Sequence, residues 1–153
     1  MTQNPSDAYL ETQVQTASPV KLRLLLIEGA IRFLTLAKER HAAGEPNGAA
    51  ESGARAQAIL AEILNGLWTA QGEIAQQQKR LYGFLMRLTT TMQLRRDFTQ
   101  VDEVLKVLFE ERETWRELVR LHGNLSLDRQ STFIAAPHLP LENISTPAFS
   151  FEA

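Results

Sequence analysis

The residues best suited to metal binding or to proton transfer near neutral pH are three histidines, His41, His122 and His138. A di-iron site in a helical bundle needs a glutamate three residues before a histidine, but the residues at that spacing are Lys38, Val119 and Ala135. The absence of cysteine excludes thiolate ligands, thiol nucleophiles and disulfides. The glycines near residues 44–53 follow a helical pattern rather than a strand and match no phosphate-binding spacing. We therefore expect no catalysis, no metal and no cofactor.

The length, the net charge and the apolar runs of the sequence indicate which class of protein this is. The 153 residues fit one domain with a core of its own. A net charge of −2 provides no general attraction to nucleic acids or anionic membranes. Residues 1–7 lack the basic and apolar regions of a signal peptide, and the longest apolar run, 24–27, is far too short to span a bilayer. These features predict a soluble cytoplasmic protein without membrane insertion.

Hydrophobic periodicity predicts four helices, at about Pro19–His41, Ser52–Trp68, Glu73–Leu94 and Thr99–Leu121. Ser18 suits the N-cap of the first helix, and Pro19 suits its first position. This helix is apolar over more than half its circumference, so we expect it to be central. One apolar face contains Leu22, Leu25, Leu26, Gly29, Ala30, Phe33, Leu34 and Ala37, and the neighbouring face adds Leu24, Ile27 and Ile31.

Helices of this length joined by short connections predict an all-α fold, an antiparallel up-and-down four-helix bundle over residues 18–123. Residues 42–48 carry turn signals and are predicted to be a linker. Residues 1–17 are predicted to be a mobile N-terminal arm, and residues 124–153, with three prolines and little charge, a non-helical C-terminal tail. Residues 72–96 hold five basic residues and one acidic, and residues 97–122 four basic and seven acidic. We expect these opposite charges to pair the third and fourth helices.

Several sequence blocks resemble one protein family from about Asn4 to Trp115. They are Asn4-Pro5, Thr16-Ala17-Ser18-Pro19, Ile59-Leu60-Ala61-Glu62-Ile63-Leu64, Gly72-Glu73-Ile74-Ala75, Leu81-Tyr82-Gly83-Phe84-Leu85-Met86, Asp102-Glu103-Val104-Leu105 and Glu113-Thr114-Trp115. In this order, they resemble the flagellar secretion chaperone FliS family. The resemblance implies a four-helix bundle that binds the C-terminal segment of flagellin in the cytoplasm. Such a protein prevents premature polymerisation and delivers flagellin to the flagellar export apparatus, with the export gate as a further partner.

The chain has more apolar side chains than one small bundle needs, which predicts a helix-in-groove binding surface made of arm residues and of apolar residues on the last three helices. The resemblance implies that the arm can cover this surface and give way to flagellin. The predicted partner-binding residues are Tyr9, Leu10, Val14, Trp68, Tyr82, Met86, Val104 and Leu108. Because periodicity does not separate groove residues from core residues, each of the helical positions has both interpretations. The tail lies outside the resemblance, and we expect Phe133-Ile134 or Phe149-Ser150-Phe151 to pack on the bundle.

The sequence leaves an alternative to the flagellin chaperone open. A chaperone of this kind is expected to be a monomer or weak homodimer, whereas the alternative is a structural, self-associating bundle or adaptor without this client. A third hypothesis is nucleic-acid binding through Lys79, Arg80, Arg87, Arg95 and Arg96. Only Tyr82 adds a stacking ring among these basic residues, and an acidic helix is expected beside them, so we predict no nucleic-acid partner.

Overall fold

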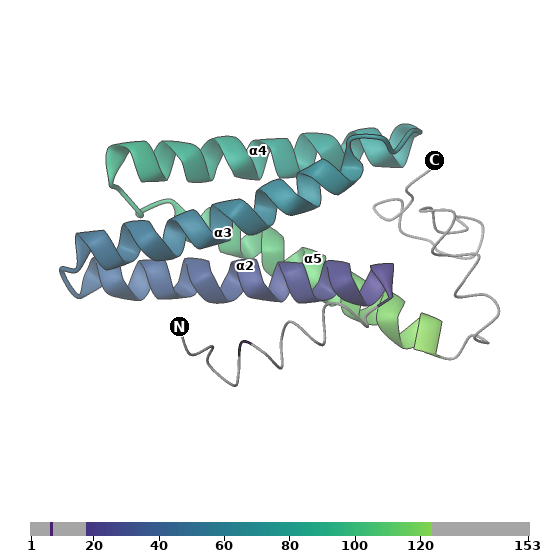
Figure 1. Cartoon of the computed structure of the whole chain (residues 1–153), viewed down its shortest axis with the longest axis horizontal. Helices are drawn as coiled ribbons and strands as arrows, with labels where there is room; N and C mark the ends of the chain where they lie inside the picture. The colour runs from purple at the N-terminus through teal and green to yellow at the C-terminus, as the bar shows by residue number, and fades with distance from the viewer. Residues whose placement is uncertain (1–6, 8–17, 124–153) are drawn as a thin grey trace.

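The computed structural model describes residue 7 and residues 18–123. Residues 18–123 form four helices, α2 (Pro19–Ala42), α3 (Pro46–Leu67), α4 (Glu73–Arg95) and α5 (Val101–Gly123). Successive helices run in opposite directions, which confirms the predicted all-α, up-and-down bundle (Figure 1). Apart from residue 7, the predicted arm and tail lie outside the described residues.

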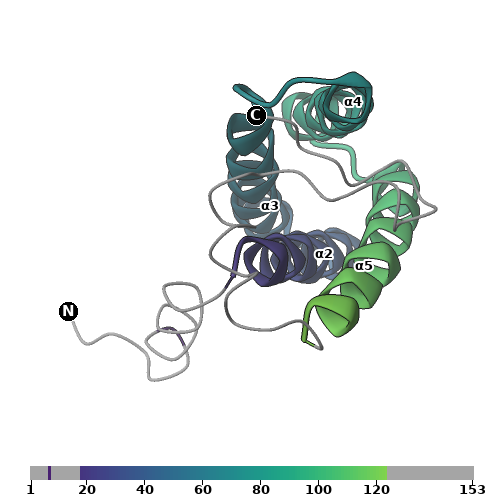
Figure 2. The same ribbon diagram turned by 90° about the vertical axis from the view of Figure 1, so that its right-hand side faces the viewer.

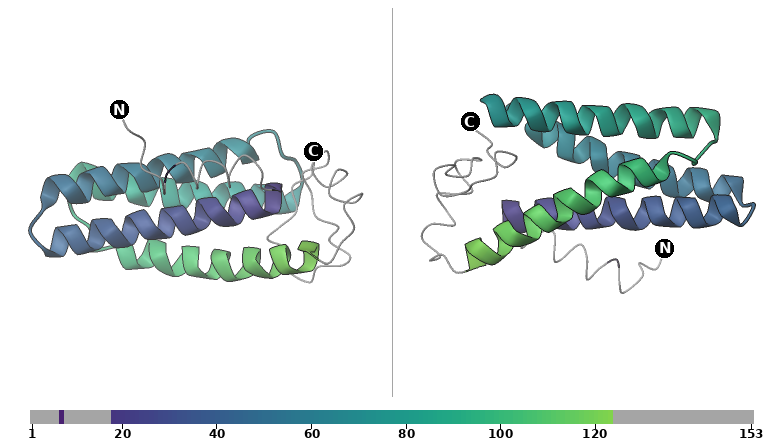
Figure 3. Two further views of the ribbon diagram at one scale, coloured as in Figure 1. Left: turned by 60° about the horizontal axis from the view of Figure 1, so that its bottom comes forward. Right: turned by 180° about the vertical axis from the view of Figure 1, so that it is seen from behind.

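The helices surround one large apolar core unevenly, and Ala37, Ala49 and Phe98 form a smaller cluster. Seen from the end, α2 lies between α3 and α5, and α4 lies against α3 (Figure 2). Helices α4 and α5 contact each other least. From behind, α5 runs obliquely across α2 (Figure 3). Helix α2 is therefore central, as predicted, because it is packed on by both α3 and α5. Among the described residues, no helix combines the length and the apolar character that crossing a bilayer requires.

The start of α2 has the predicted cap. The Ser18 hydroxyl accepts a hydrogen bond from the Lys21 backbone N–H at 3.3 Å, and Pro19 occupies the first turn. The cap satisfies one of the backbone donors that a helix N-terminus leaves without a partner. The helix ends before Gly44, whose φ of +74° is a left-handed conformation that glycine adopts easily.

Helix α3 begins at Pro46 and not near Ser52, so the prediction of a linker through residue 48 was wrong. Proline at the first position favours this start, and the small residues that follow pack closely against neighbouring helices. Ala49 and Ser52 are buried. A Cβ on Gly53 would lie only 2.5 Å from the Gln93 Oε1 of α4, so this glycine permits close helix contact. Tertiary packing thus outweighs the low helix propensity of glycine and serine.

The side of α2 that is buried in the core includes residues from both predicted apolar faces. Its most buried apolar residues are Val20, Ile27, Ala30, Ile31, Leu34 and Ala37. Leu22, Leu25, Leu26 and Phe33, from the larger apolar face, are only half-buried. A helix that is apolar on nearly every side has no single face that periodicity can select as the core.

The predicted charge pairing between the third and fourth helices was also wrong. The interhelical ion pairs that the structure shows join α5 to α2: Lys38 Nζ to Asp102 Oδ1 at 2.7 Å, and Arg116 to Glu28 Oε1 at 3.3 Å. The reason is geometric, because α4 and α5 contact each other least. Both pairs are partly exposed, so each contributes only about 0–1 kcal/mol.

Candidate partner-binding surface

One side of α2 carries a strip of half-buried apolar side chains. We call it the α2 outer face and define it by Leu22, Leu25, Leu26, Gly29 and Phe33, which recur at helical spacing. At about 1.5 Å per residue, the strip is roughly 17 Å long. On α3, Ile59 borders it, with its Cδ1 only 3.2 Å from the position a Gly29 Cβ would take. The small glycine therefore lets Ile59 extend the apolar surface from α2 onto α3.

Cationic side chains edge the α2 outer face. The guanidinium carbons of Arg32 and Arg55 lie 5.0 and 5.6 Å from the centroid of the Phe33 ring. Such cation–π contacts hold the arginine stems against the ring and leave charge at the edge of the apolar strip. Arg55 also pairs with Glu51 at 3.4 Å. The surface suits an amphipathic helix with carboxylates beside its apolar stripe.

Beneath the surface, α2, α4 and α5 share a buried polar cluster around Arg23. Its guanidinium carbon lies 4.8 Å from the Trp115 ring centroid and 5.6 Å from that of Tyr82. Its Nη1 donates to Gln78 Oε1 at 3.5 Å. The Tyr82 hydroxyl donates to Glu111 Oε2 at 3.0 Å, and Trp115 Nε1 donates to the same oxygen at 3.4 Å. The cluster fixes three helices relative to one another.

Burial controls the protonation of this cluster. It raises the pKa of Glu111, although the Tyr82 hydrogen bond and the Arg23 charge act in the opposite direction. Burial also lowers the pKa of Arg23 and raises that of Tyr82 well above its usual value. Because Arg23 and Glu111 are enclosed, we interpret the cluster as a structural feature and not as a site open to solutes. Among the described residues, no group of three or more acidic or histidine side chains is placed to hold a metal.

Sequence reasoning missed Arg23, which is only 9% exposed. A signal was present, because Arg23 is the one charged residue between Val20 and Glu28 apart from Lys21, in the most apolar part of the helix. A charge inside such a run indicates burial with partners on other helices. Its partners are distant in sequence, however: Gln78 is 55 residues away.

The predicted binding residues fall into different environments. Three of them lie outside the described residues: Tyr9, Leu10 and Val14. Three are fully buried together in the core: Tyr82, Val104 and Leu108. Met86 is partly buried against that core, and Trp68, directly after α3, is 79% exposed. The binding role of each stays a prediction.

Comparison with known proteins shows which family the chain belongs to. The profile of a family described as flagellar protein FliS matches residues 1–122. The flagellar secretion chaperone FliS of Bacillus subtilis (strain 168) is 26% identical over 118 residues, which cover 77% of this chain and 88% of that protein. The flagellar secretion chaperone FliS of Campylobacter jejuni (strain 81116) is 30% identical over 119 residues, covering 77% and 91%. The chain therefore belongs to the FliS family.

Proposed function

We propose that this protein is a flagellar export chaperone that binds the C-terminal helical segment of flagellin. In this proposal it prevents premature polymerisation and delivers flagellin to the flagellar export apparatus, without catalysis. Membership of the FliS family and the names of the two relatives support the chaperone role. The structural observation that carries the binding proposal is the half-buried apolar strip of the α2 outer face.

The physical case rests on complementary surfaces. A client helix whose apolar stripe is covered only in the assembled filament needs another apolar surface while it is monomeric. The α2 outer face, roughly 17 Å long, spans about three helical turns. A segment that folds on this surface loses conformational entropy, so binding stays reversible even though a large area is covered. Arg32 and Arg55 would pair with carboxylates along the client helix.

We further propose that the arm occupies the α2 outer face before flagellin does. Tyr9, Leu10 and Val14 would supply its apolar contacts. Asp7 and Glu11 are the arm's charged residues, and both are opposite in sign to the arginines at the edge. Flagellin would displace this segment, which makes the arm a competitor for the same surface.

The remaining predicted residues have two proposed roles. Trp68 and Met86 reach the surface and would contact the client directly. Tyr82, Val104 and Leu108 are enclosed, so they would act by shaping the bundle, or would contact a client only where α4 or α5 shifts. A loss of client affinity in variants of these three should therefore come with a loss of stability.

Calorimetric titration with roughly the last forty residues of flagellin from the same genome tests the proposal. We expect saturable 1:1 binding with a negative heat-capacity change and a gain of helix. Leu25→Asp on the α2 outer face should weaken binding at least about tenfold. Leu94→Asp is the matched control, because Leu94 is 80% exposed on α4. Its affinity should equal that of the wild type.

The outcomes separate the alternatives. If both variants bind like the wild type, the client uses another surface. If the folded wild type binds no flagellin segment, the self-associating bundle becomes the better hypothesis. Sedimentation would then show a fixed oligomer in place of a monomer or weak homodimer, and Leu25→Asp would dissociate it.

A further inference from the structure

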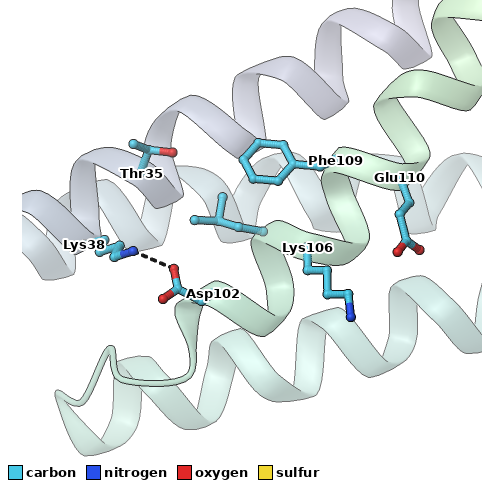
Figure 4. A pocket seen from close by; sticks show the side chains of 7 residues that line it. Thr35, Lys38, Asp102, Lys106, Phe109 and Glu110 are labelled. Carbon is cyan, nitrogen blue, oxygen red and sulfur yellow. Dashed lines mark hydrogen bonds and ion pairs between the residues drawn. The ribbon is translucent and has the colours of Figure 1, made fainter.

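A hollow of about 540 Å³ lies between α2 and α5, on a side of α2 different from the α2 outer face. Its lining residues are Thr35, Lys38, Asp102, Leu105, Lys106, Phe109 and Glu110. Figure 4 shows the Phe109 ring above the α2–α5 crossing and the Lys38–Asp102 ion pair at one end. Leu105 is buried, whereas Phe109 is 40% exposed. The hollow thus offers apolar surface that the four helices leave incompletely covered.

The charges around the hollow indicate what it would accept. Lys38 and Lys106 are balanced by Asp102 and Glu110, so the rim has no net charge. Lys38 and Asp102 already pair with each other at 2.7 Å. A strongly acidic or basic segment would therefore gain little from this rim and would lose hydration. An uncharged segment with large apolar side chains is the best match.

The sequence after α5 contains such a segment. We propose that residues 130–137 of this chain, with Phe133 and Ile134 as anchors, dock in the hollow between α2 and α5. No Asp, Glu, Lys or Arg occurs from Gln130 to Leu141. The segment lies beyond residue 122, where the match to the family profile ends. It does not depend on flagellin binding.

Chain length permits this docking. From Gly123 back to Phe109, the axis of α5 covers roughly 21 Å at about 1.5 Å per residue. The stretch from Gly123 to Phe133 spans up to about 33 Å when extended, at about 3.3 Å per residue. Phe133 therefore reaches the hollow with length to spare. The chain has only to turn back after α5 and run alongside that helix.

Other segments of the chain are less suited to the hollow between α2 and α5. The arm carries Asp7 and Glu11 without a compensating basic residue, so it is better suited to the cationic edge of the α2 outer face. Phe149 and Phe151 are separated by Ser150, and Phe151 is next to Glu152. Phe133 and Ile134 alone combine two adjacent large apolar side chains with uncharged neighbours on both sides.

Because the full chain has no cysteine, pairs of introduced cysteines can test the docking. The test pair is Lys106→Cys at the rim with Thr132→Cys beside Phe133. The control pair is Arg87→Cys with Thr132→Cys, since Arg87 is exposed on α4. From the end of the bundle where α5 finishes and α4 begins, Arg87 lies roughly 21 Å along its helix and Lys106 roughly 26 Å (Figure 1). If distance from this end of the bundle alone set the rate of disulfide formation, the control pair would therefore close faster.

The measured quantity is the rate of intramolecular disulfide formation in one glutathione redox buffer. We expect the test pair to close at least about tenfold faster than the control, which corresponds to ~1.4 kcal/mol. When Phe133→Ser and Ile134→Ser are added to both pairs, the test pair should no longer close faster than the control pair. Adding Phe149→Ser and Phe151→Ser instead should leave the rate difference unchanged. Equal rates for the two pairs would overturn the proposal. A rate difference that persists without Phe133 and Ile134, or predominantly disulfide-linked dimers, would overturn it as well.

Discussion

Tyr82→Phe is the most informative single change in the buried cluster. It deletes one hydroxyl and keeps the ring, which is fully buried and lies 5.6 Å from the Arg23 guanidinium. The deleted group donates to Glu111 Oε2 at 3.0 Å. That oxygen would keep the Trp115 donor, at the longer distance of 3.4 Å. The variant therefore removes the hydrogen bond of Tyr82 to the Glu111 carboxylate, together with the interaction of its hydroxyl with Arg23.

The expected loss of stability follows from this geometry. Hydrogen bonds to charged groups contribute about 1.5–3 kcal/mol, and an acceptor left short of donors in a core is unfavourable. Because Trp115 and Gln78 still form hydrogen bonds to the Glu111 carboxylate, we expect Tyr82→Phe to lower the free energy of unfolding by about 2 kcal/mol. With a urea m value of about 2 kcal/mol/M, the midpoint would fall by roughly 1 M.

Urea unfolding followed by circular dichroism measures this difference. Thr91→Val is the control, because it deletes a hydroxyl on the same helix whose bond, to the Arg87 carbonyl, is exposed. We expect the control to lie within about 0.5 kcal/mol of the wild type. A Tyr82→Phe midpoint equal to that of the control would refute the assignment of a stabilising bond.

The pH dependence of Tyr82→Phe provides a second check. The Tyr82 hydrogen bond favours ionised Glu111, so deleting it raises the Glu111 pKa further. The loss of stability should be smaller near pH 4, where more of Glu111 is protonated, than near pH 8. A loss of stability that does not change with pH would mean that the Glu111 carboxylate is not the acceptor that matters.

Three further predictions follow from the same structure. The folded pKa of Glu111 is raised above its usual value of 4.5, so its favourable contribution is present at low pH and is lost as pH rises. The stability of Glu111→Gln relative to wild type should therefore increase between pH 4 and pH 8 in urea titrations, and a constant difference would contradict this. Gly53→Ala should destabilise by about 1–3 kcal/mol, because its Cβ would lie 2.5 Å from Gln93 Oε1, and the Gln93 amide is held in place by donating to the Ala50 carbonyl. Gly66→Ala, with nothing within 4 Å, should stabilise by up to about 1 kcal/mol, and thermal melts that rank the two the other way would disprove the packing argument. Ser18→Ala should lower stability by about 1 kcal/mol in the same melts, and no change would mean that the cap at Lys21 contributes little.

Much of the fold could be predicted because its signals are local. A serine before a proline begins α2 as expected, and apolar periodicity locates all four helices. The start of α3 at Pro46 could not be predicted in this way. Ala49, Ser52 and Gly53 look like linker residues by propensity, and they are helical because close packing against α2 and α4 rewards small side chains.

The candidate surface was harder to predict because it depends on what packs against each face. Leu22 and Ile27 are both apolar residues of one helix, yet the first is half-buried and the second is fully buried. Only the positions of α3 and α5 distinguish them. Tyr82 shows the same limit, because its burial depends on Arg23 and Glu111, which are supplied by two other helices.

The packing of α5 against α2 determines when the bundle can be completed. The ion pair between Glu28 and Arg116 joins residues 88 positions apart, and that between Lys38 and Asp102 joins residues 64 apart. The first helix in this bundle to be synthesised is therefore covered by the last. During translation, α2 and α3 can pair early, but the α5 side of α2 stays without its partner until the final helix has been made. Contacts between distant segments slow folding, so closure by α5 is expected to be the slow step in the maturation of the nascent chain.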